Sequence, residues 1–300
     1  ALGRVTWQGS QENNIVNERT AESQEDAAPI PHSLMIHDNR ETDVSRQFKG
    51  CAWFREKGVG SYLKPFVSRN GFDWTLIAKG DRVPSEDTKR LMLDTLKHRY
   101  VLTVKGLNGC GVTKYGAAEL GRIVYLSFSD DFVHWTEPEL IFHADEKDQE
   151  LGKASVEEAI RNPDRRSPVF IKPDECFTDV YFLPVFVYED LYLGLPIMFN
   201  QSGHYFSTKS SNQDGILAPH LVSSRNLYDW NRLNRSPLIP HSPLSDSYLF
   251  DHAGIYATPP VPNGDELWFY YHGRRYSHVN PEITDTLKQS PDEPTSGIFL

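Results

Sequence analysis

The chain has 300 residues, of which 39% are hydrophobic and 24% charged, and its formal net charge is −10. This composition is ordinary for a globular protein with a sizeable core. Its acidic balance argues against nucleic acid or an anionic membrane as the partner, because either would need a basic face. No apolar run is long enough for a transmembrane helix, and no signal peptide is visible in a chain that starts at Ala1.

The chain divides into a short arm and a series of repeated modules. Residues 1–29 are polar and predict an irregular N-terminal arm, and residues 30–300 are expected to form one domain. Each module has an apolar run containing an aspartate, then an aromatic-rich strand, then a third strand. Repeated strand-rich units are typical of propellers and solenoids. The modules span, in order, residues 34–74, 91–135, 177–230 and 249–300.

The fourth module stops at residues 296–300, where its third strand should begin, so the last blade is expected to be incomplete. Helix signals are few. Only residues 154–160 keep helical spacing, and they predict a short helix at most. Residues 143–167 and 279–296 are rich in charge and proline, so they predict long surface loops, where binding residues often lie.

The pattern Ser-x-(Asp/Asn)-x-x-(Asp/His)-Trp occurs at residues 68–74, 129–135 and 224–230. A Ser or Asx side chain can accept hydrogen bonds from backbone amides two or three residues later and so fix a tight turn. The tryptophan that ends the motif can then pack between adjacent sheets. The repeat therefore predicts scaffold rather than chemistry.

Residues 129–141, 224–233 and 265–275 carry a resemblance to a known family. With weaker matches elsewhere, they resemble the five-bladed propellers of the arabinanase, levansucrase and invertase superfamily, which includes glycoside hydrolase families 43 and 32. The resemblance implies an all-β fold: a five-bladed β-propeller of four-stranded antiparallel blades around a central funnel. It also implies glycosidase activity, although the Asn-Asp-Pro and Arg-Asp-Pro motifs of invertases are absent, which disfavours sucrose or fructan.

In that superfamily three carboxylates on the innermost strands act as base or nucleophile, orienting group and general acid. Carried over to this chain, the resemblance implies Asp38 as the base or nucleophile and Asp94 as the orienting residue. It places the general acid near Asp179. The family acid is usually Glu, so Glu175 and Glu189, on either side of Asp179, stay open as alternatives.

Glycosidic cleavage needs one protonated and one ionised carboxyl on opposite sides of the anomeric carbon. Their separation, about 5–5.5 Å for retention and about 6.5–9.5 Å for inversion, is not fixed by the sequence. An aspartate beside a strand is equally suited to a turn, because it can accept hydrogen bonds from its own backbone. Recurrence of aspartate in all four modules fits a shared turn as well as it fits a shared funnel.

Several other side chains are expected near the funnel. Aromatic rings suit the apolar faces of sugars, so Tyr181, Tyr256 and Trp268 could also stack on substrate, but core packing is the default for each. The predicted substrate-binding residues are His37, Trp53, Asp251, His252 and Arg274.

No His, Cys or Asp spacing is typical of a catalytic metal site, so no metal ligand is predicted and no cofactor is required. The resemblance is compatible with a structural Ca²⁺ near the axis. Cys51, Cys110 and Cys176 are expected to be mostly buried free thiols. No Gly-x-Ser-x-Gly or phosphate-binding loop is present, so a serine hydrolase or nucleotide-binding function is not indicated.

These observations predict a glycoside hydrolase that cleaves a poly- or oligosaccharide by carboxylate acid/base catalysis. Its expected partner is a carbohydrate and its expected location is secreted or periplasmic. Two alternatives stay open: a non-catalytic glycan-binding propeller, and a glycoside phosphorylase with a cationic phosphate subsite. The candidate cations for that subsite are Arg165, Arg166, Arg274 and Arg275.

Overall fold

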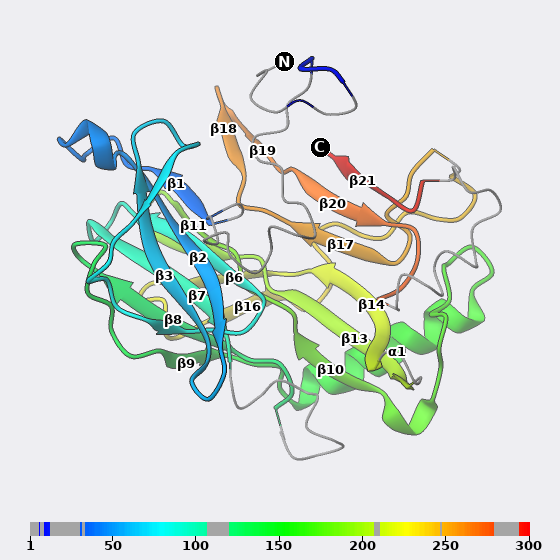
Figure 1. Ribbon diagram of the computed structural model, residues 1–300. Coiled ribbons are helices and arrows are strands. Elements are labelled where there is room, and N and C mark those ends of the chain that lie inside the picture. Colours follow the sequence, from blue (N-terminus) through cyan, green and yellow to red (C-terminus); the bar gives the residue numbers. More distant parts are fainter. Residues whose placement is uncertain are drawn as a thin grey trace.

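The computed structural model describes residues 6, 9–12, 31, 34–106, 120–206, 211–246, 248–278 and 294–300. This part of the chain is mostly β-structure with one α-helix, and its strands form four consecutive antiparallel units, here called blades I to IV (Figure 1). Blade I consists of β1 (Met35–His37), β2 (Phe48–Glu56), β3 (Gly60–Ser68) and β4 (Trp74–Leu76), with β5 (Val83–Pro84) beside β3. Blade II consists of β6 (Lys89–Asp94), β7 (Arg99–Lys105), β8 (Val124–Ser129) and β9 (Glu139–Phe142).

Blade III is a four-stranded unit whose first three strands are each interrupted once. Its strands are β10 (Phe177–Val180) with β11 (Val185–Tyr188), β12 (Leu191–Gly194) with β13 (Ile197–Phe206), β14 (Ser211–Pro219) with β15 (Leu221–Ser224), and β16 (Asn231–Asn234). The interruptions include Pro184 and Pro196 or directly follow Pro219, because proline has no N–H to donate to a ladder. Backbone bonds still cross the gap, with Tyr181 N donating to Ile197 O at 2.8 Å.

Blade IV contains β17 (Gly254–Ala257), β18 (Val261–Asn263), β19 (Glu266–Trp268), β20 (Tyr271–Arg274) and β21 (Ser296–Phe299). β17 and β20 pair antiparallel, β18 and β19 form a hairpin beyond them, and β21 is the third strand expected at residues 296–300. A single parallel pair, Leu217 with Gly254, joins β14 to β17 and so links blades III and IV.

The hydrophobic core lies between neighbouring blades. One cluster joins Leu34, Cys51 and Leu63 of blade I to the blade II side chains, a second joins blades II and III, and a third joins blades III and IV. Each fully buried Leu, Ile or Phe contributes about 1.5–3 kcal/mol relative to an exposed one. The blades therefore stabilise one another face to face, as blades of a propeller do.

The repeated turn has the predicted hydrogen bonds. Ser68 Oγ accepts from the Gly71 amide at 3.0 Å, and Asn70 Oδ1 accepts from the amides of Phe72 and Asp73 at 2.9 Å. The other two copies have the same Asx bonds. Trp135 and Trp230 pack against the clusters between blades, so the structural role of the motif is confirmed.

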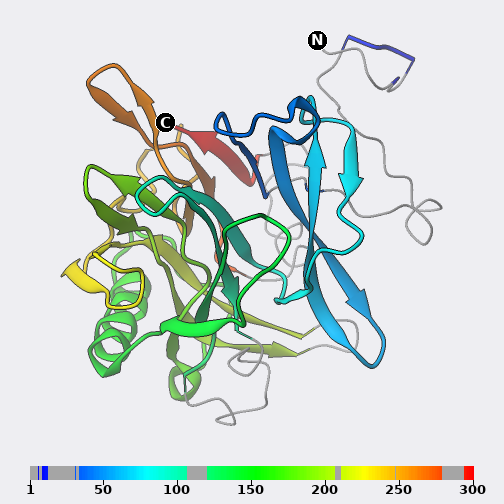
Figure 2. The same cartoon turned by 90° about the vertical axis from the view of Figure 1, so that its left-hand side faces the viewer.

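The loop predicted at residues 143–167 is wrong over most of its length, because it contains α1 (Glu146–Arg161), packed against β10 and β13 on the side away from blade I (Figure 2). Asp145 and Asp148 form a reciprocal capping box at its start. The buried positions Asp148, Gly152, Val156 and Ala159 have helical spacing, but only two of the four are hydrophobic. Hydrophobic periodicity therefore gave too weak a signal. Two 3₁₀ turns complete the elements, η2 (Val44–Arg46) and η3 (Pro173–Glu175).

Several predictions fall on residues outside the described ranges, including most of the N-terminal arm, Cys110, and residues 279–293 of the second predicted loop. The other two cysteines are free thiols, with Cys51 buried and Cys176 partly buried. No helix in the described part of the chain is long and apolar enough to cross a membrane.

Candidate active site at the propeller axis

The four module aspartates do not occupy one equivalent position, as the sequence had suggested. Asp38 directly follows β1 and Asp94 is the last residue of β6, so both lie where the first strand of a blade ends. Asp179 lies inside β10 and Asp251 precedes β17, near the starts of their strands. Apolar runs of different length were aligned on their acidic residue, so the aspartates that this alignment made equivalent lie at different points along their strands.

Asp38 fixes the β1–β2 connection and the contact with the next blade. Its Oδ1 accepts from the Arg40 amide at 3.1 Å and from Arg40 Nε at 3.0 Å. Its Oδ2 accepts from the Tyr100 hydroxyl, at the start of β7, at 2.5 Å. Burial opposes ionisation of Asp38, but the hydrogen bonds from Arg40 and Tyr100 prevail and lower its pKa to about 2. Asp38 is therefore an ionised carboxylate that links blade I to blade II.

Asp94 repeats this arrangement one blade further on. Its Oδ1 accepts from the amides of Leu96 and Lys97 at 3.1 Å, and its Oδ2 accepts from Arg99 Nε at 3.2 Å. The Tyr192 hydroxyl of blade III donates to it at 2.9 Å. Asp38 and Asp94 thus share an Asx turn, an arginine and a tyrosine from the following blade.

Asp94 and Asp179 lie at opposite ends of the blades. Lys89 and Asp94 are five positions apart in an extended strand, and at about 3.3 Å per position they lie roughly 16 Å from one another. Lys89 pairs with Val104 and Lys105 pairs with Val124, so the start of β6, the end of β7 and the start of β8 share one end. Asp179 contacts Arg122, just before β8, and therefore belongs to that end. We call it the axial end, and the end with Asp38 and Asp94 the hairpin end.

At the axial end, Asp179 is fully buried and holds Arg122 in place. Its Oδ2 accepts from the Arg122 amide at 3.1 Å, from Arg122 Nη1 at 2.9 Å and from Gln201 Nε2 at 2.8 Å. Arg122 Nη2 also donates to Gln213 Oε1 at 2.8 Å. Asp179 Oδ1 has no hydrogen-bond partner among the described residues. Complete burial raises the pKa of Asp179, although the Arg122 guanidinium opposes that shift.

Gly121 makes the Arg122–Asp179 contact possible. It has φ +65°, and a Cβ there would come within 2.8 Å of Asp179 Cβ and 2.5 Å of the Phe177 ring. A larger residue would push the Arg122 amide away from the carboxylate. The glycine therefore permits both the left-handed turn and the close approach.

Asp87 is the second carboxylate of the axial end. Its Oδ1 accepts from Lys105 Nζ at 2.7 Å, and its side chain is 63% exposed. The positive charge of Lys105 also acts on Asp179, and the negative charge of Asp87 also acts on Arg122. Burial is outweighed at Asp87 by the cations Lys105, Arg122 and Lys89, which lower its pKa. The two carboxylates thus lie around a shared pair of cations, with pKa values shifted in opposite directions.

Aromatic rings and a histidine border this cluster. The Arg122 guanidinium lies 5.6 Å from the Tyr181 ring centre, and the Tyr181 hydroxyl is 3.0 Å from His278 Nε2. His278 Nδ1 lies 3.0 Å from the Gln213 carbonyl oxygen, so Nδ1 donates there and Nε2 accepts from Tyr181. Tyr256 packs edge-on against Tyr181 and bonds Arg274. Predicted residues Tyr181, Tyr256 and Arg274 therefore do meet near Asp179.

Lys89 and Trp53 add the blade I side of the cluster. Lys89 Nζ lies 5.2 Å from the Trp53 ring centre, and Trp53 Nε1 donates to the Ser85 carbonyl oxygen at 3.1 Å. Burial, together with repulsion from Arg90 and Lys105, lowers the pKa of Lys89 to about 8. Trp53 thus lies near the axial end.

Three predicted substrate-binding residues lie apart from this cluster. His37 packs against Phe48 with the two rings tilted by 33° and their centres 4.8 Å apart. Buried Asp251 accepts from the Tyr271 hydroxyl at 2.8 Å, and His252 Nδ1 bonds the Ser242 carbonyl oxygen at 3.1 Å. These contacts give each residue a packing role in blades I or IV.

The alternative acids and the other predicted arginines also have local partners. Glu175 accepts from Lys172 Nζ at 3.0 Å, and Glu189 occupies a left-handed position, φ 53°, in the β11–β12 hairpin. Arg165 donates to the His241 carbonyl oxygen, whereas Arg166 and Arg275 pack over Tyr276 and Phe250. Of the four arginines predicted for a phosphate subsite, Arg274 alone is seen with the axial residues.

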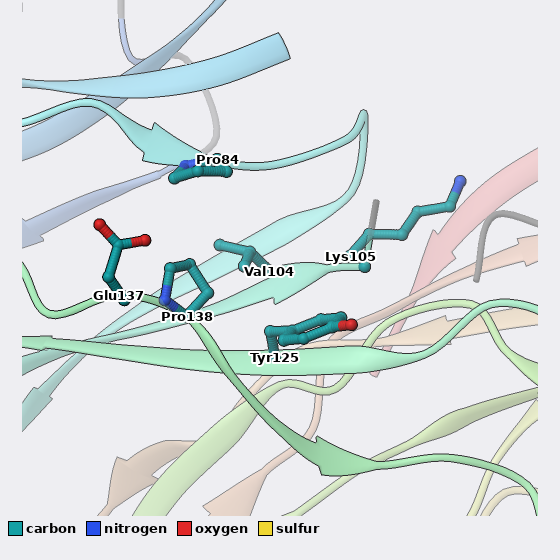
Figure 3. A pocket seen from close by; sticks show the side chains of 7 residues that line it. Pro84, Val104, Lys105, Tyr125, Glu137 and Pro138 are labelled. Atoms are coloured by element: carbon teal, nitrogen blue, oxygen red, sulfur yellow. The ribbon is translucent and has the colours of Figure 1, made fainter. Parts of the chain in front are cut away.

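A separate hollow of about 180 Å³ opens beside Lys105, between β5 and the β7–β9 face of blade II (Figure 3). Its walls are largely apolar, from Pro84, Val104, Tyr125 and Pro138, and Glu137 provides one carboxylate. Figure 3 shows the Lys105 side chain extending away from the hollow. This hollow lacks a second carboxylate and so does not meet the needs of glycoside hydrolysis.

Among the residues that the structure describes, no group of three or more His, Cys, Asp or Glu side chains could hold a metal ion. The axial donors instead pair with cations: Asp87 with Lys105 and Asp179 with Arg122. The axial cluster therefore consists of carboxylates paired with cations.

Asp87, Lys105 and Arg122 were not predicted as site residues. A signal for Asp87 did exist, since it lies just before β6 as Asp179 lies near the start of β10. If the modules had been aligned on the starts of their first strands, Asp87 would have been predicted as the counterpart of Asp179. Lys105 and Arg122 come from the end of one strand and the approach to another, and no sequence motif marks them.

The sequence matches no protein-family model, and no curated protein matches it. Solved structures do match. An N-acetylgalactosamine deacetylase from F. plautii, in complex with blood group B trisaccharide, is 13% identical with a TM-score of 0.50. The match covers 80% of this chain and 61% of the deacetylase chain. The present chain thus spans less than two thirds of that protein.

Two glycosidases also match. A thermostable family-43 glycoside hydrolase is 14% identical, with 88% of this chain and 69% of that chain covered and a TM-score of 0.49. An endo-arabinase from Bacteroides thetaiotaomicron is 12% identical, with 86% and 76% covered and a TM-score of 0.45. At such identities the likeness concerns the fold alone. The predicted all-β fold of antiparallel blades is confirmed, and the described residues form four such blades.

Proposed function

We propose that the protein is a glycoside hydrolase whose substrate binds at the axial end. The observation that supports this most is the convergence of two carboxylates, Asp87 and Asp179, around the cations Lys105 and Arg122, beside the ring of Tyr181. A pair of titratable groups whose environments shift their pKa values apart is the usual basis for dividing acid and base roles.

In this proposal Asp87 is the ionised carboxylate that acts as base or nucleophile. It is exposed, and the neighbouring cations lower its pKa. An exposed anionic oxygen can either activate a water molecule or attack the anomeric carbon. Lys105 Nζ, 2.7 Å from its Oδ1, restrains the side chain.

Asp179 is the proposed proton donor. Its Oδ2 is held by Arg122 and Gln201, so the proton would reside on Oδ1, which has no partner among the described residues. Burial favours the protonated form. Because Asp179 is fully enclosed, substrate binding must open a path to Oδ1. Asp38 and Asp94, implied as catalytic by resemblance, are assigned here to structure.

The test is a screen of plant and algal glycans for release of reducing ends, followed by substitutions at both ends of the blades. Asp87→Asn and Asp179→Asn should lower kcat about 10²–10⁴-fold, the usual contribution of general acid/base groups. Asp94→Asn is the matched control and should keep its rate while losing stability. A folded Asp94→Asn protein that loses activity as fully as Asp179→Asn would overturn the axial assignment.

A non-catalytic glycan-binding propeller is the second candidate, and the enclosure of Asp179 favours it, since only Asp87 of the two carboxylates is exposed. Binding of a glycan without release of reducing ends, unchanged by Asp179→Asn, would support this candidate. A secreted or periplasmic location stays a prediction under both.

A further inference from the structure

We propose that the axial site takes a sugar that carries an anionic group, a carboxylate or a sulfate ester. This inference rests on the proposed function only in placing the glycan at the axial end, and it names the chemical class of that glycan. It follows from the balance of charge at the axial end, which differs from that of the whole chain.

Cations outnumber carboxylates at this end. The axial cations among the described residues are Lys89, Arg90, Lys105, Arg122 and Arg274, and the carboxylates are Asp87, Asp179 and Glu86, whose amide donates to the Lys105 carbonyl oxygen. Asp87 forms a salt bridge with Lys105 and Asp179 forms one with Arg122. Lys89, Arg90 and Arg274 form no salt bridge with any described residue. A chain with a formal net charge of −10 thus concentrates positive charge at its axis.

Lys89 and Arg90 are held in place by carbonyl oxygens and aromatic rings rather than by a salt bridge. Lys89 Nζ donates to the Asp87 carbonyl oxygen at 3.0 Å and lies over Trp53. The Arg90 guanidinium lies 3.9 Å from the Phe182 ring centre, and its Nη1 donates to the Lys89 carbonyl oxygen at 2.7 Å. Burial lowers the pKa of Arg90 to about 10. Partly desolvated cations cost free energy unless an anion compensates them.

Three buried or half-buried cations elsewhere in the molecule do have carboxylate partners. Lys49, 1% exposed, bonds Glu41 at 2.8 Å. Arg232 bonds Asp148 at 2.8 Å, and Arg235 bonds Asp145 at 2.7 Å. Lys89, Arg90 and Arg274 differ from these three cations and share with Arg165 and Arg166 the lack of a salt bridge to any described residue.

The surrounding rings indicate a sugar rather than a bare inorganic ion. Trp53, Tyr181 and Tyr256 lie next to the axial cations and are half-buried, and the ring of Tyr256 stacks on Phe182 and His272. A pyranose ring has apolar C–H faces that suit such rings, and a carboxylate or sulfate on it would accept charge-assisted hydrogen bonds from Lys89 and Arg274. The two features together fit a uronic acid or a sulfated sugar.

The test measures Kd by calorimetry for matched pairs of oligosaccharides. Oligogalacturonate is compared with its fully methyl-esterified form for the carboxylate, and carrageenan oligosaccharides with neutral agarose oligosaccharides for the sulfate. Inorganic sulfate alone serves as the third probe. We expect one charged oligosaccharide to bind at least tenfold more tightly than its neutral partner and than sulfate, and which one does so identifies the anionic group.

Variants then locate the binding. Lys89→Gln and Arg274→Gln should each weaken binding of the charged oligosaccharide about tenfold, the value of one charge-assisted hydrogen bond, and leave the neutral one unchanged. Lys89→Arg should restore affinity, which a general loss of packing would not allow. Lys97→Gln is the matched control, since Lys97 is an exposed lysine at the hairpin end of the same β6–β7 unit.

The outcomes separate this inference from the proposed hydrolase activity. Tighter or equal binding of the neutral forms, or no binding of any charged form below 1 mM (about −4.1 kcal/mol), overturns the inference. In that case hydrolysis of a neutral glycan that depends on Asp87 would leave the hydrolase proposal standing. Charge-dependent binding without cleavage would support the inference and count against the hydrolase.

Discussion

The two ends of β6 carry acidic residues in very different surroundings. At the hairpin end, Asp94 is buried and bonded by two amides, an arginine and a tyrosine of the next blade. At the axial end, Asp87 is exposed and faces cations from several strands. A carboxylate that accepts hydrogen bonds from several protein groups on both oxygens stabilises the fold. One that faces solvent and unbalanced positive charge is able to meet a ligand.

The same contrast holds between Asp38 and Asp179, although both are buried. Asp38 repeats the Asp94 arrangement, with Tyr100 in the place of Tyr192. Asp179 leaves Oδ1 without a partner among the described residues, and its pKa is raised by burial. Burial alone therefore does not separate the two ends; the number of donors to each carboxylate does.

The largest expected effect is on activity at the axial end. Asp87→Asn should lower hydrolysis of an identified glycan about 10²–10⁴-fold, because the amide can act neither as base nor as nucleophile. Asp130→Asn, an exposed aspartate at the hairpin end, is the control and should leave the rate within about twofold, as surface changes usually do. Initial rates at saturating substrate measure both. Equal losses would remove the functional distinction between the ends.

The next effect is on stability at the hairpin end. Asp94→Ala should lower the free energy of unfolding by about 2–3 kcal/mol, because it leaves the buried Tyr192 hydroxyl and two amides without their acceptor. Urea titration measures the change. Asp265→Ala, at the exposed β18–β19 hairpin, should cost less than about 0.5 kcal/mol. If Asp94→Ala lowered the free energy of unfolding no more than Asp265→Ala, Asp94 would not stabilise the contact between blades II and III.

Low pH should remove the stabilising contribution of Asp38, which links blades I and II as Asp94 links blades II and III. Because the pKa of Asp38 is lowered from 3.8 to about 2, its contribution to stability is present above the unfolded value and is lost as pH falls through about 2. That contribution is about 2 kcal/mol. In Asp38→Asn, the fall in unfolding free energy between pH 4 and pH 2 should be smaller by this amount. Parallel pH profiles of the two proteins would show that Asp38 is not the group involved.

The smallest effect concerns alkaline pH at the axial end. Burial, with repulsion from Arg90 and Lys105, lowers the pKa of Lys89 to about 8, although Asp87 favours its charge. Below that pH it is protonated, so binding of an acidic oligosaccharide should weaken about tenfold between pH 7 and pH 9. Lys89→Arg stays charged over this range and should show a flat profile. A wild-type Kd that does not change across this interval would exclude Lys89 from the binding site.

The sequence indicated much of the scaffold. The repeated Ser-to-Trp turn depends on side chains that bond their own neighbouring amides, so its geometry is local and could be predicted. Strand-rich modules between the turns followed from β-branched and aromatic residues. Helix α1 was predicted only over residues 154–160, because its buried face includes Asp148 and Gly152, whose places are set by Arg235 and by close contact with Thr178.

The candidate site was only partly predictable. Asp179, Arg274 and Trp53 were identified, but Asp38 and Asp94 were grouped with Asp179, although they lie at the other end of the blades. Sequence patterns show that an aspartate lies beside a strand and do not show which end of the blade it faces. Which end an aspartate faces depends on how many residues separate the aspartate from the preceding turn.

The amino-acid sequence by itself determined the modules, their turns and the tryptophans between blades, because these rest on contacts within a few residues or on simple periodicity. The tertiary structure alone decided which charges meet. Asp87, Lys105, Arg122, Asp179 and Arg274 come from three blades and almost 190 positions of sequence, and antiparallel pairing brings them to one end. Long-range register sets that proximity, and no local pattern encodes it.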